Sequence, residues 1–517
     1  MIVGIDLGTT FCAVAHLDDR GKPVTLPNRD GETLTPSAVY LTGTGEAVVG
    51  QPALDVALEQ PGHVASLVKR QMGRPDFGRK VAGRSFRPET LSAVILRKLV
   101  MDAERHVGPI TQAVITVPAY FDDTRRQATL DAGAIAGLEV LDILDEPSAA
   151  ALAYTFQQSA AANLKPGELP PDAPKTVLVY DLGGGTFDVT LVRLGKKRFQ
   201  TLAIEGDVRL GGKDWDDRLV NHVAGLFVAQ FKSDPRDDEQ SLAMLQASAE
   251  RAKRTLSKVD AATITCTHDG RKMTVPVTRA DFERLTMDLL LRTRLTSQQV
   301  IQQAMLTWGQ VDKVLMVGGS THMPATGRML QELTGKEPDR SLAVSEVVAR
   351  GAAVHAGIQA AKLARAASAT AGGPLADIVE ISVNAHSLGV EIRQGEEKLN
   401  NKLIGKNTQL PAATSRVYRT NADNQTKVRV RVLQGEHQQA EACVPVGEVW
   451  IDGLPADLPK GSPIQVRCGV TANGRIEVMA LDMTSGRMAR AELHRSGGLT
   501  PEQIAAEAEW VRGLRIQ

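Results

Sequence analysis

One short pattern recurs in this chain: an apolar strand that runs into an aspartate and then into a glycine turn. It occurs at residues 5–10 as I-D-L-G-T-T and again at residues 180–186 as Y-D-L-G-G-G-T. A third turn, V-G-G-S-T at residues 317–321, follows another apolar run. Glycine turns expose successive backbone amides to a phosphate, because no side chain blocks its approach. Three such turns predict one phosphate cradle built from two related halves, so a nucleotide is the first ligand to test.

The segments on either side of the first two turns predict hairpins. Strands are expected at residues 2–7 and 11–17, and again at 176–182 and 187–194. A dinucleotide-binding fold or a P-loop would enter a helix directly after its glycine turn, so this arrangement argues against both. Helical periodicity of apolar residues recurs between the strands. It predicts helices at residues 91–105, 124–136, 147–157, 241–257 and 281–306. This alternation predicts a mixed α/β architecture.

Composition limits the classes of partner. The 517 residues include 60 basic and 60 acidic side chains, and only 4% are aromatic. A neutral chain with few aromatic residues gives no reason to expect nucleic acid or a membrane surface as a partner. The four cysteines are far apart and form no C-x-x-C pair, which favours a reducing, cytoplasmic location. No stretch approaches the length of a membrane span.

Beyond residue 360 the pattern changes. A proline-rich loop is expected earlier, at residues 166–174, and a small-residue linker at 366–373. Alternating runs such as residues 428–432 and 464–468 then predict an antiparallel β domain. Thr500 and Gln503 predict the start of a last helix with one weak apolar stripe.

The turns carry side chains suited to phosphate and metal chemistry. Asp6 and Asp181 end their strands beside the turns, where a carboxylate can hold a hydrated Mg²⁺ that bridges phosphate oxygens. Thr9, Thr10 and Thr186 add hydroxyl donors. Attack by water on a terminal phosphate needs chiefly positioning and neutralisation of charge, and Asp188 could orient that water.

These turns together resemble the actin-like ATPase superfamily, and other segments narrow the resemblance to the heat-shock protein 70 family of chaperones. The matching segments are G-I-D-L-G-T-T (4–10), I-T-V-P-A-Y-F (115–121), D-E-P (145–147), residues 181–188, V-G-G-S-T (317–321) and V-L-Q-G-E (432–436). The resemblance implies a two-lobed ATPase domain followed by an antiparallel β-sandwich and a short C-terminal helix. The implied boundaries are 1–172 and 173–360 for the lobes, 361–382 for a linker, 383–498 for the β domain and 499–517 for the helix.

The resemblance also implies roles for individual residues. Lys69 corresponds to the lysine that reaches the γ-phosphate, although alone it would be taken for a surface lysine. Glu146 corresponds to the carboxylate that sets up the metal and the attacking water, although alone it is a helix-entry acid. With Asp181, Asp188 and Thr186 these form the catalytic set, and Asp6 and Asp181 are the metal residues. The implied cofactors are ATP or ADP with Mg²⁺, and K⁺ is a further candidate ion. The implied nucleotide-binding residues are Gly8, Thr9, Thr10, Phe11, Gly183, Gly184, Gly185, Gly211, Gly212, Glu250, Lys253, Arg254, Ser257, Gly318, Gly319, Ser320 and His322.

Further positions correspond to the family's relay and peptide groove. Pro118 and Arg126 correspond to residues that report the nucleotide state, and Tyr418, Val428 and Val430 to residues that line a groove for unfolded or extended apolar peptides. For the valines, plain sheet core is an equally good interpretation. The face formed by Glu250, Lys253, Arg254 and Ser257 would otherwise be read as a solvated charged helix face.

Several positions depart from the family pattern. The expected leucine-rich linker reads D-I-V-E-I-S at residues 377–382, and Asp142 and Asp145 replace an arginine and an asparagine. His322 stands where an arginine covers the adenine, and the segment after Gly498 is too short for a multi-helix lid. The leading prediction is therefore a lidless ATP-dependent chaperone that a dedicated J-domain protein could serve. The alternative is an ATP-switched module for one dedicated partner, and a small-molecule kinase is the weakest interpretation.

Overall fold

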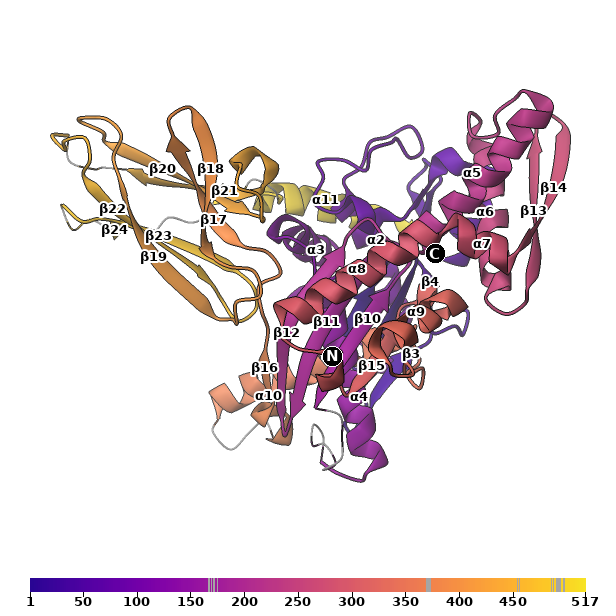
Figure 1. Ribbon diagram of the computed structural model, residues 1–517, viewed down its shortest axis with the longest axis horizontal. Helices are drawn as coiled ribbons and strands as arrows, with labels where there is room; N and C mark the ends of the chain where they lie inside the picture. The colour runs from indigo at the N-terminus through magenta and orange to yellow at the C-terminus, as the bar shows by residue number, and fades with distance from the viewer. Residues whose placement is uncertain are drawn as a thin grey trace.

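A computed structural model gives the fold. It describes residues 1–165, 168, 170, 173, 175–368, 373–452, 454, 456–484, 486, 488–489, 494–495 and 498–517. Two parts follow each other along the chain and lie side by side (Figure 1). The α/β region, residues 1–381, holds two large sheets with helices packed around them, whereas the β region, residues 388–495, is antiparallel sheet. The predicted mixed α/β class is therefore confirmed.

The first large sheet contains the first glycine turn. Its strand order is β3-β2-β1-β8-β9, with β4 paired to β2. Strand β1 is antiparallel to β2 and parallel to β8, so the predicted hairpin around Gly8 is confirmed. The strands are β1 (Ile2–Leu7), β2 (Phe11–Leu17), β3 (Pro23–Leu26), β4 (Thr35–Pro36), β8 (Gln112–Val117) and β9 (Glu139–Asp145).

The second large sheet repeats this plan around the second turn. Its order is β15-β10-β11-β12-β16, and β10 is antiparallel to β11 and parallel to β15. The outer strand β16 lies parallel to β12. The strands are β10 (Thr176–Leu182), β11 (Phe187–Gly195), β12 (Arg198–Asp207), β15 (Lys313–Val317) and β16 (Val379–Ile381). Two sheets with the same hairpin-plus-parallel-strand plan bear out the internal repeat seen in the sequence.

Two helices fill the space between the large sheets. Helix α4 (Glu146–Ala161) contacts β10 and β9, and α10 (Val347–Ala367) contacts β1 and β2. Small residues permit this close packing, because a side chain at Gly351 would meet the backbone of Ala149. One buried cluster accordingly contains residues from both sheets and both helices. The sheets are thus held together along their inner faces.

The other helices cover the outer faces. Helices α2 (Pro88–Val107) and α3 (Asp123–Ile135) bury apolar residues against the first sheet, and α5, α6 and α8 bury theirs against the second. A hairpin and a short helix complete the second half. The bounds are α1 (Gln51–Val56), α5 (Gly212–Phe231), α6 (Glu239–Leu256), β13 (Ala261–His268), β14 (Arg271–Thr278), α7 (Arg279–Leu285), α8 (Met287–Gln303) and α9 (Pro324–Thr334).

The β region consists of two sheets that share one core. The sheets have the orders β18-β17-β20-β21-β25 and β19-β22-β23-β24. Alternate residues of these strands point inward, for example Ile464, Val466 and Cys468 on β22. The strands are β17 (Leu388–Gln394), β18 (Glu397–Ile404), β19 (Ala412–Arg419), β20 (Lys427–Gln434), β21 (Val444–Asp452), β22 (Pro463–Val470), β23 (Ile476–Asp482), β24 (Met488–Ala489) and β25 (His494–Arg495).

The end of the chain returns to the α/β region. Helix α11 (Pro501–Gly513) packs on α2 and α3, and strand β26 (Arg515–Ile516) joins a small sheet of order β26-β6-β5-β7. In Figure 1 the yellow α11 lies between the β region and the helices of the first sheet. The remaining strands of this sheet are β5 (Ala38–Leu41), β6 (Glu46–Val49) and β7 (Val64–Ser66).

Most predicted helices are confirmed, but the one at residues 281–306 is wrong as a single element. The chain breaks at Thr286, whose buried hydroxyl donates to the carbonyl of Phe282 at 2.8 Å, and two helices result. At Thr286 the backbone leaves helical geometry, with φ −118° and ψ 10°, so α7 and α8 are separate elements. Helix α10 runs to Ala367, inside the predicted linker. The predicted loop at 166–174 lies largely outside the described residues, as does the part of the linker at 369–372.

Candidate functional site

The two hairpin tips face each other. A side chain at Gly184 would overlap the side chain of Thr10, and one at Gly185 would overlap that of Thr9. The amide of Gly183 donates to the carbonyl of Thr186 at 3.0 Å, which closes the second tip. Only glycine allows backbone to come this near, and its amides are then left open to a ligand. The structure therefore brings the two predicted phosphate turns together.

The third turn and a further glycine pair complete the same cluster. Gly318 has φ 83°, a conformation that favours glycine, and a side chain there would meet Leu182 and Asp181. The hydroxyl of Ser320 donates to the carbonyl of Gly183 at 2.8 Å. The amide of Gly212, at the start of α5, donates to the same carbonyl at 3.0 Å. All predicted glycine turns thus converge from both sheets, and Gly8, Gly211 and Gly319 lie within them.

Five ionisable side chains lie beside this cluster; Asp6 is half-buried, and the other four are buried. Asp6 ends β1, Asp181 ends β10, Asp188 lies on β11, and Glu146 begins α4. Lys69, in a short 3₁₀ turn at Val68–Gln71, forms an ion pair with Glu146. The carboxylate of Asp6 accepts from the hydroxyl of Thr116 at 3.0 Å. The predicted catalytic residues therefore gather in one place, and Thr186 at the tip of the second hairpin is also buried.

Crowded negative charge dominates the electrostatics of this group. Burial, followed by the charge of Glu146, raises the pKa of Asp6 to about 7. The same two causes raise the pKa values of Asp181 and Asp188 well above the ordinary range. Burial opposes the protonated form of Lys69, but the carboxylates of Glu146 and Asp6 still raise its pKa. Four acids with one lysine leave an excess of negative charge that a cation would relieve.

The donor set suits Mg²⁺ held through water. Carboxylate oxygens are the ligands that Mg²⁺ prefers, and the ion commonly keeps several waters. Among the described residues, no three His, Cys, Asp or Glu side chains are placed to hold one metal ion directly. Asp6 and Asp181 therefore fit an ion that is shared with water and phosphate rather than one enclosed by protein. In the part of the chain that the structure describes, no geometry singles out a K⁺ position.

The predicted nucleotide-binding face of α6 points partly toward the glycine turns. The ammonium group of Lys253 donates to the carbonyl of Gly212 at 3.0 Å and to Asp216 at 2.8 Å. The guanidinium of Arg254 lies 5.6 Å from the ring centre of Phe11, across the two halves. Arg254 also pairs with Glu250 on the surface, as the simpler interpretation of this face expected. Ser257 is the C-cap of the helix, and its hydroxyl donates to the Lys253 carbonyl at 3.3 Å.

His322 follows the third glycine turn. Its side chain is exposed at the end of the 3₁₀ turn Gly319–His322. It lines a cavity of about 360 Å³ together with Leu34, Arg340 and Leu342. An exposed imidazole beside a cavity can stack on a flat ring, with less area and less charge than an arginine.

One residue of the site has no counterpart among the sequence predictions. Arg70 donates through Nε to the carbonyl of Gly185 at 2.9 Å and forms an ion pair with Asp214. Asp214 in turn accepts from the amide of Gly211 at 2.8 Å. Arg70 therefore ties the Lys69 turn to the second hairpin. The only sequence signal for Arg70 was its position next to Lys69, because no sequence pattern relates Arg70 to Asp214.

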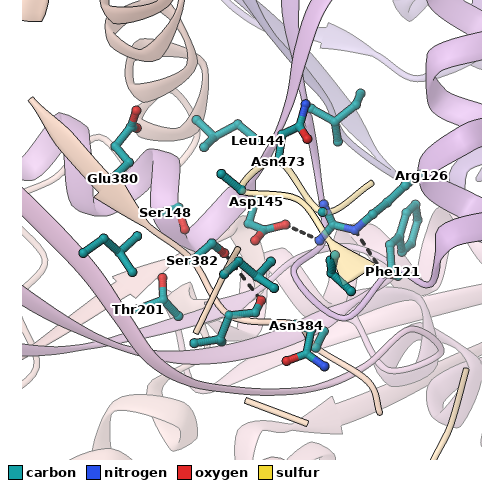
Figure 2. Close-up of a pocket in the computed structure, with 18 of the residues that line it drawn as sticks. Phe121, Arg126, Leu144, Asp145, Ser148, Thr201, Glu380, Ser382, Asn384 and Asn473 are labelled. Carbon is teal, nitrogen blue, oxygen red and sulfur yellow. Dashed lines mark hydrogen bonds and ion pairs between the residues drawn. The ribbon is translucent and has the colours of Figure 1, made fainter. Parts of the chain in front are cut away.

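The predicted relay residues lie where the site meets the β region. The amide of Tyr120, two residues after Pro118, donates to Asp188 at 3.1 Å, while its carbonyl lies 2.9 Å from His386 Nε2 of the segment that enters the β region. Arg126 pairs with Asp145 and donates to the carbonyl of Phe121 at 3.2 Å. Figure 2 shows this pair in the wall of a cavity of about 120 Å³ between the two regions.

The unusual acids noted in the sequence lie around the same cavity. His355 Nδ1 is 2.7 Å from Glu380 on β16, and its Nε2 is 3.0 Å from Asp142 on β9. Burial opposes protonation of this imidazole, but the charge of Glu380 and the hydrogen bond to Asp142 raise its pKa to about 10. The acids at 142, 145 and 380 are therefore paired inside the protein with His355 and Arg126, and Lys362 lies 3.8 Å from Glu380 as a third cation.

The predicted groove residues all belong to the core of the β region. Val430 on β20 is buried, and Tyr418 and Val428 pack against the same cluster while partly exposed. The hydroxyl of Tyr418 accepts from the amide of Asn401 at 3.1 Å. For Val430 the interpretation as sheet core fits this placement.

Comparison with known protein families gives a match over nearly the whole chain. Within the described residues, we find no helix with the length and apolar character needed to cross a membrane. A family model described as Hsp70 protein matches the chain in two overlapping segments, residues 2–80 and 75–510. Because these segments span nearly the whole chain, including every glycine turn and both regions, the chain belongs to the Hsp70 family.

Proposed function

We propose that this chain is an ATP-hydrolysing chaperone whose nucleotide site is the cluster of glycine turns. Membership in the Hsp70 family implies ATP-dependent chaperone activity in general. The observation that carries the assignment of the site is the convergence of three glycine turns on the Lys69–Glu146 pair, the buried Asp181 and Asp188, and the half-buried Asp6. We assign the two large sheets to the lobes of an actin-like ATPase, with boundaries near residues 172 and 360.

Each residue group has a role in this proposal. A bound Mg²⁺ would neutralise phosphate charge and bridge phosphate oxygens, and Asp6 and Asp181 would hold it through water. The amides of residues 8–10, 184 and 185 bind the phosphates. Lys69 offers its ammonium group to the terminal phosphate, and Glu146 fixes that lysine. Asp188, held by the Tyr120 amide, orients the attacking water. Lys253, Arg254, Phe11 and His322 border the base.

The β region is the proposed substrate domain. Two antiparallel sheets with a common core suit the binding of extended peptides by strand-like backbone contacts. We take residues 383–498 as this domain and residues 361–382 as its linker. Helix α11 packs on α2 and α3, so it supports the proposal of a groove without a lid. The four free, buried cysteines are compatible with a cytoplasmic location.

The placement of Val430 in the core favours a second candidate. Of the three predicted groove residues, Val430 is buried, so fewer apolar contacts face a peptide than the family resemblance implies. An ATP-switched module for one dedicated protein partner would need no general apolar groove. A dedicated J-domain protein remains a candidate partner in either case. Because Asp142 and Asp145 are paired with His355 and Arg126, they offer a basic helix less charge than the sequence suggested.

Two measurements test this proposal. The first is release of phosphate in a single turnover of ATP by the full chain with Mg²⁺, in parallel with the Asp181→Asn variant. We expect slow release that depends on Asp181, and absence of any release would contradict the ATPase assignment. The second is an array of extended peptides. Binding to many apolar sequences would support a chaperone, whereas binding to none of them would favour the dedicated-partner alternative.

A further inference from the structure

Helix α8 carries large apolar side chains on the face that points away from the protein. Met287, Leu291 and Leu295 are 55%, 48% and 58% exposed, and they recur every four residues along the helix. Residues at this spacing lie one above the other on a single helix face. Apolar residues that are exposed singly are ordinary, whereas a contiguous exposed group is typical of an interaction site. The outer face of α8 thus has the character of a contact surface.

The opposite face of α8 makes this pattern more unusual. The face that packs on β11 and β12 includes Leu289, Thr293 and Ser297, all of them buried. The hydroxyls of Thr293 and Ser297 donate to carbonyls of α8 itself, each at 2.8 Å. A surface helix ordinarily buries its apolar stripe and exposes its polar one. In the first turns of α8, which Figure 1 shows in front of β11 and β12, the larger apolar side chains instead lie on the exposed side.

Two charged residues flank the apolar stripe at matched distances from its centre. Asp288 precedes Leu291 by three residues, and Arg294 follows it by three. At 3.6 residues per turn, they lie about 60° to either side of Leu291 on the same face. Asp288 pairs with Arg218 through two exposed side chains, an arrangement that contributes little and leaves the carboxylate open to a second cation. Arg294 is partly exposed and forms no ion pair with any described residue.

This arrangement is complementary to itself. When two copies of α8 pack antiparallel about a twofold axis through Leu291, each position after Leu291 meets the position equally far before it in the second copy. Leu291 then meets Leu291 of the second copy, and Leu295 meets Met287. Arg294 of each copy lies beside Asp288 of the other. Helices that pack at a small crossing angle lie 8–10 Å apart, so these side chains would be in contact.

We propose that the outer face of α8 is a homodimer interface, covered by the same face of a second copy of this chain. Burial of the three apolar side chains from each copy supplies the attraction. The two Arg294–Asp288 pairs fix the antiparallel direction, because a parallel arrangement would place like charges together. Two turns of helix bury less surface than a permanent dimer needs, so the association is reversible and depends on concentration.

The antiparallel direction also determines where the two β regions lie. The end of α8 is adjacent to the β region of its own chain, because the side-chain amide of Asn407 donates to Gln303. In the second copy α8 runs the opposite way, so the two β regions lie at opposite ends of the paired helices. The dimer therefore keeps the β regions apart. This inference is independent of the proposed nucleotide site.

Sedimentation velocity of the full chain over a wide range of concentrations measures the association. Leu291→Glu places two like charges at the centre of the contact, and Leu226→Glu, at an exposed leucine of α5, is the matched control. We expect the parent and Leu226→Glu to shift reversibly from one chain to two as concentration rises, and Leu291→Glu to sediment as one chain throughout. Because Leu291 is exposed in the single chain, the melting temperature of Leu291→Glu should match that of the parent. A parent that stays a single chain at the highest concentration, or a dimer that survives in Leu291→Glu, would overturn the proposal.

Exchange of the flanking charges tests the antiparallel direction. Asp288→Arg or Arg294→Asp alone should weaken dimerisation by about 5-fold, since each variant loses two exposed ion pairs. The double variant, with both substitutions, should regain the affinity of the parent, because opposite charges face each other again. A double variant that associates no more tightly than the single ones would contradict the twofold pairing.

A cross-link tests the position of the twofold axis. Leu291→Cys places one thiol of each copy at the axis, and the four native cysteines are buried. Mild oxidation should join two chains through a disulfide in Leu291→Cys and leave Leu226→Cys largely as single chains. Absence of the cross-link in Leu291→Cys, or equal cross-linking in both variants, would overturn the assignment of α8 as the interface.

Discussion

His355 joins the strand that leads to the β region to the body of the α/β region, because its Nδ1 lies 2.7 Å from Glu380 Oε1. The same ring reaches Asp142, and Lys362 lies 3.8 Å from the other oxygen of Glu380. Arg126 and Asp145 face the same cavity. A protonated imidazole between two carboxylates compensates charges that would otherwise be buried without a counter-ion.

We therefore predict that His355→Gln destabilises the linker strand in a pH-dependent way. The raised pKa of His355 means that its stabilising contribution is complete below about 6.5, the ordinary histidine value, and is lost as pH rises to about 10. At pH 6 the variant should unfold with a free energy about 3 kcal/mol lower, since two buried acids lose their partner. Thermal melts at pH 6 and pH 9.5 measure this, and an equal difference at both pH values would count against it.

Glu89 on α2 predicts a loss of stability with rising pH in the neighbourhood of α11, in a lower pH window than for His355. Burial raises its pKa to about 7, and one of its buried oxygens has no hydrogen-bond partner among the described residues. The folded protein then binds a proton that the unfolded chain releases near 4.5, so stability falls as pH rises through this window. Glu89→Gln should raise the melting temperature at pH 8 and change it little at pH 4.5. Glu59→Gln, an exposed site, is the control.

Substitution of Lys69 should separate ATP binding from ATP hydrolysis. Its ammonium group is buried against Glu146 beside the glycine turns, where it would act on the terminal phosphate. Lys69→Ala should lower the single-turnover rate by about 10²–10³-fold, as for loss of one electrostatic group in a closed site, while ATP still binds. Lys272→Ala on β14 removes an exposed lysine and should leave the rate unchanged. Equal rates for the parent and Lys69→Ala would remove Lys69 from the mechanism.

Substitution of His322 tests whether this residue contacts the base of the nucleotide. An arginine at this exposed position would offer a permanent charge and a larger flat surface to the base. His322→Arg should tighten ADP binding by about 2–5-fold, which corresponds to a cation–π gain of about 0.5–1 kcal/mol. Titration calorimetry measures the affinity, and His106→Arg at the end of α2 adds the same charge at a remote exposed site. A gain of the same size in the control would show a general effect of charge.

The two hairpins and the residues at their tips could be predicted from the sequence, because both depend on a local sequence pattern. An apolar run that ends in Asp6 or Asp181 and is followed by glycine forms the same turn wherever it occurs. The break at Thr286 was missed because the apolar periodicity continues across it, and periodicity does not detect non-helical dihedral angles at a single residue. The Arg70–Asp214 pair joins positions far apart in sequence, so no local signal could reveal it.

The last helix, α11, shows the same limit of prediction from local sequence. It was expected from Thr500 and Gln503, and the structure confirms that cap, in which Gln503 accepts from the Thr500 amide at 3.0 Å. Its apolar stripe looked weak because only a few positions carry the contact, with Val511 fully buried and Trp510 against Phe86. Where the helix docks depends on the surface of α2 and α3, which periodicity in residues 499–517 cannot specify.

The dependence of ATP binding on Mg²⁺ tests the central claim most directly. Calorimetric titration of the nucleotide-free full chain should give one ATP site that is tighter with Mg²⁺ than with a chelator. In Asp181→Asn that gain from Mg²⁺ should be largely lost, because one of the two carboxylates proposed to hold the hydrated ion is gone. Absence of ATP binding, or an undiminished gain from Mg²⁺ in Asp181→Asn, would contradict the assignment of the glycine turns and their aspartates as the nucleotide site.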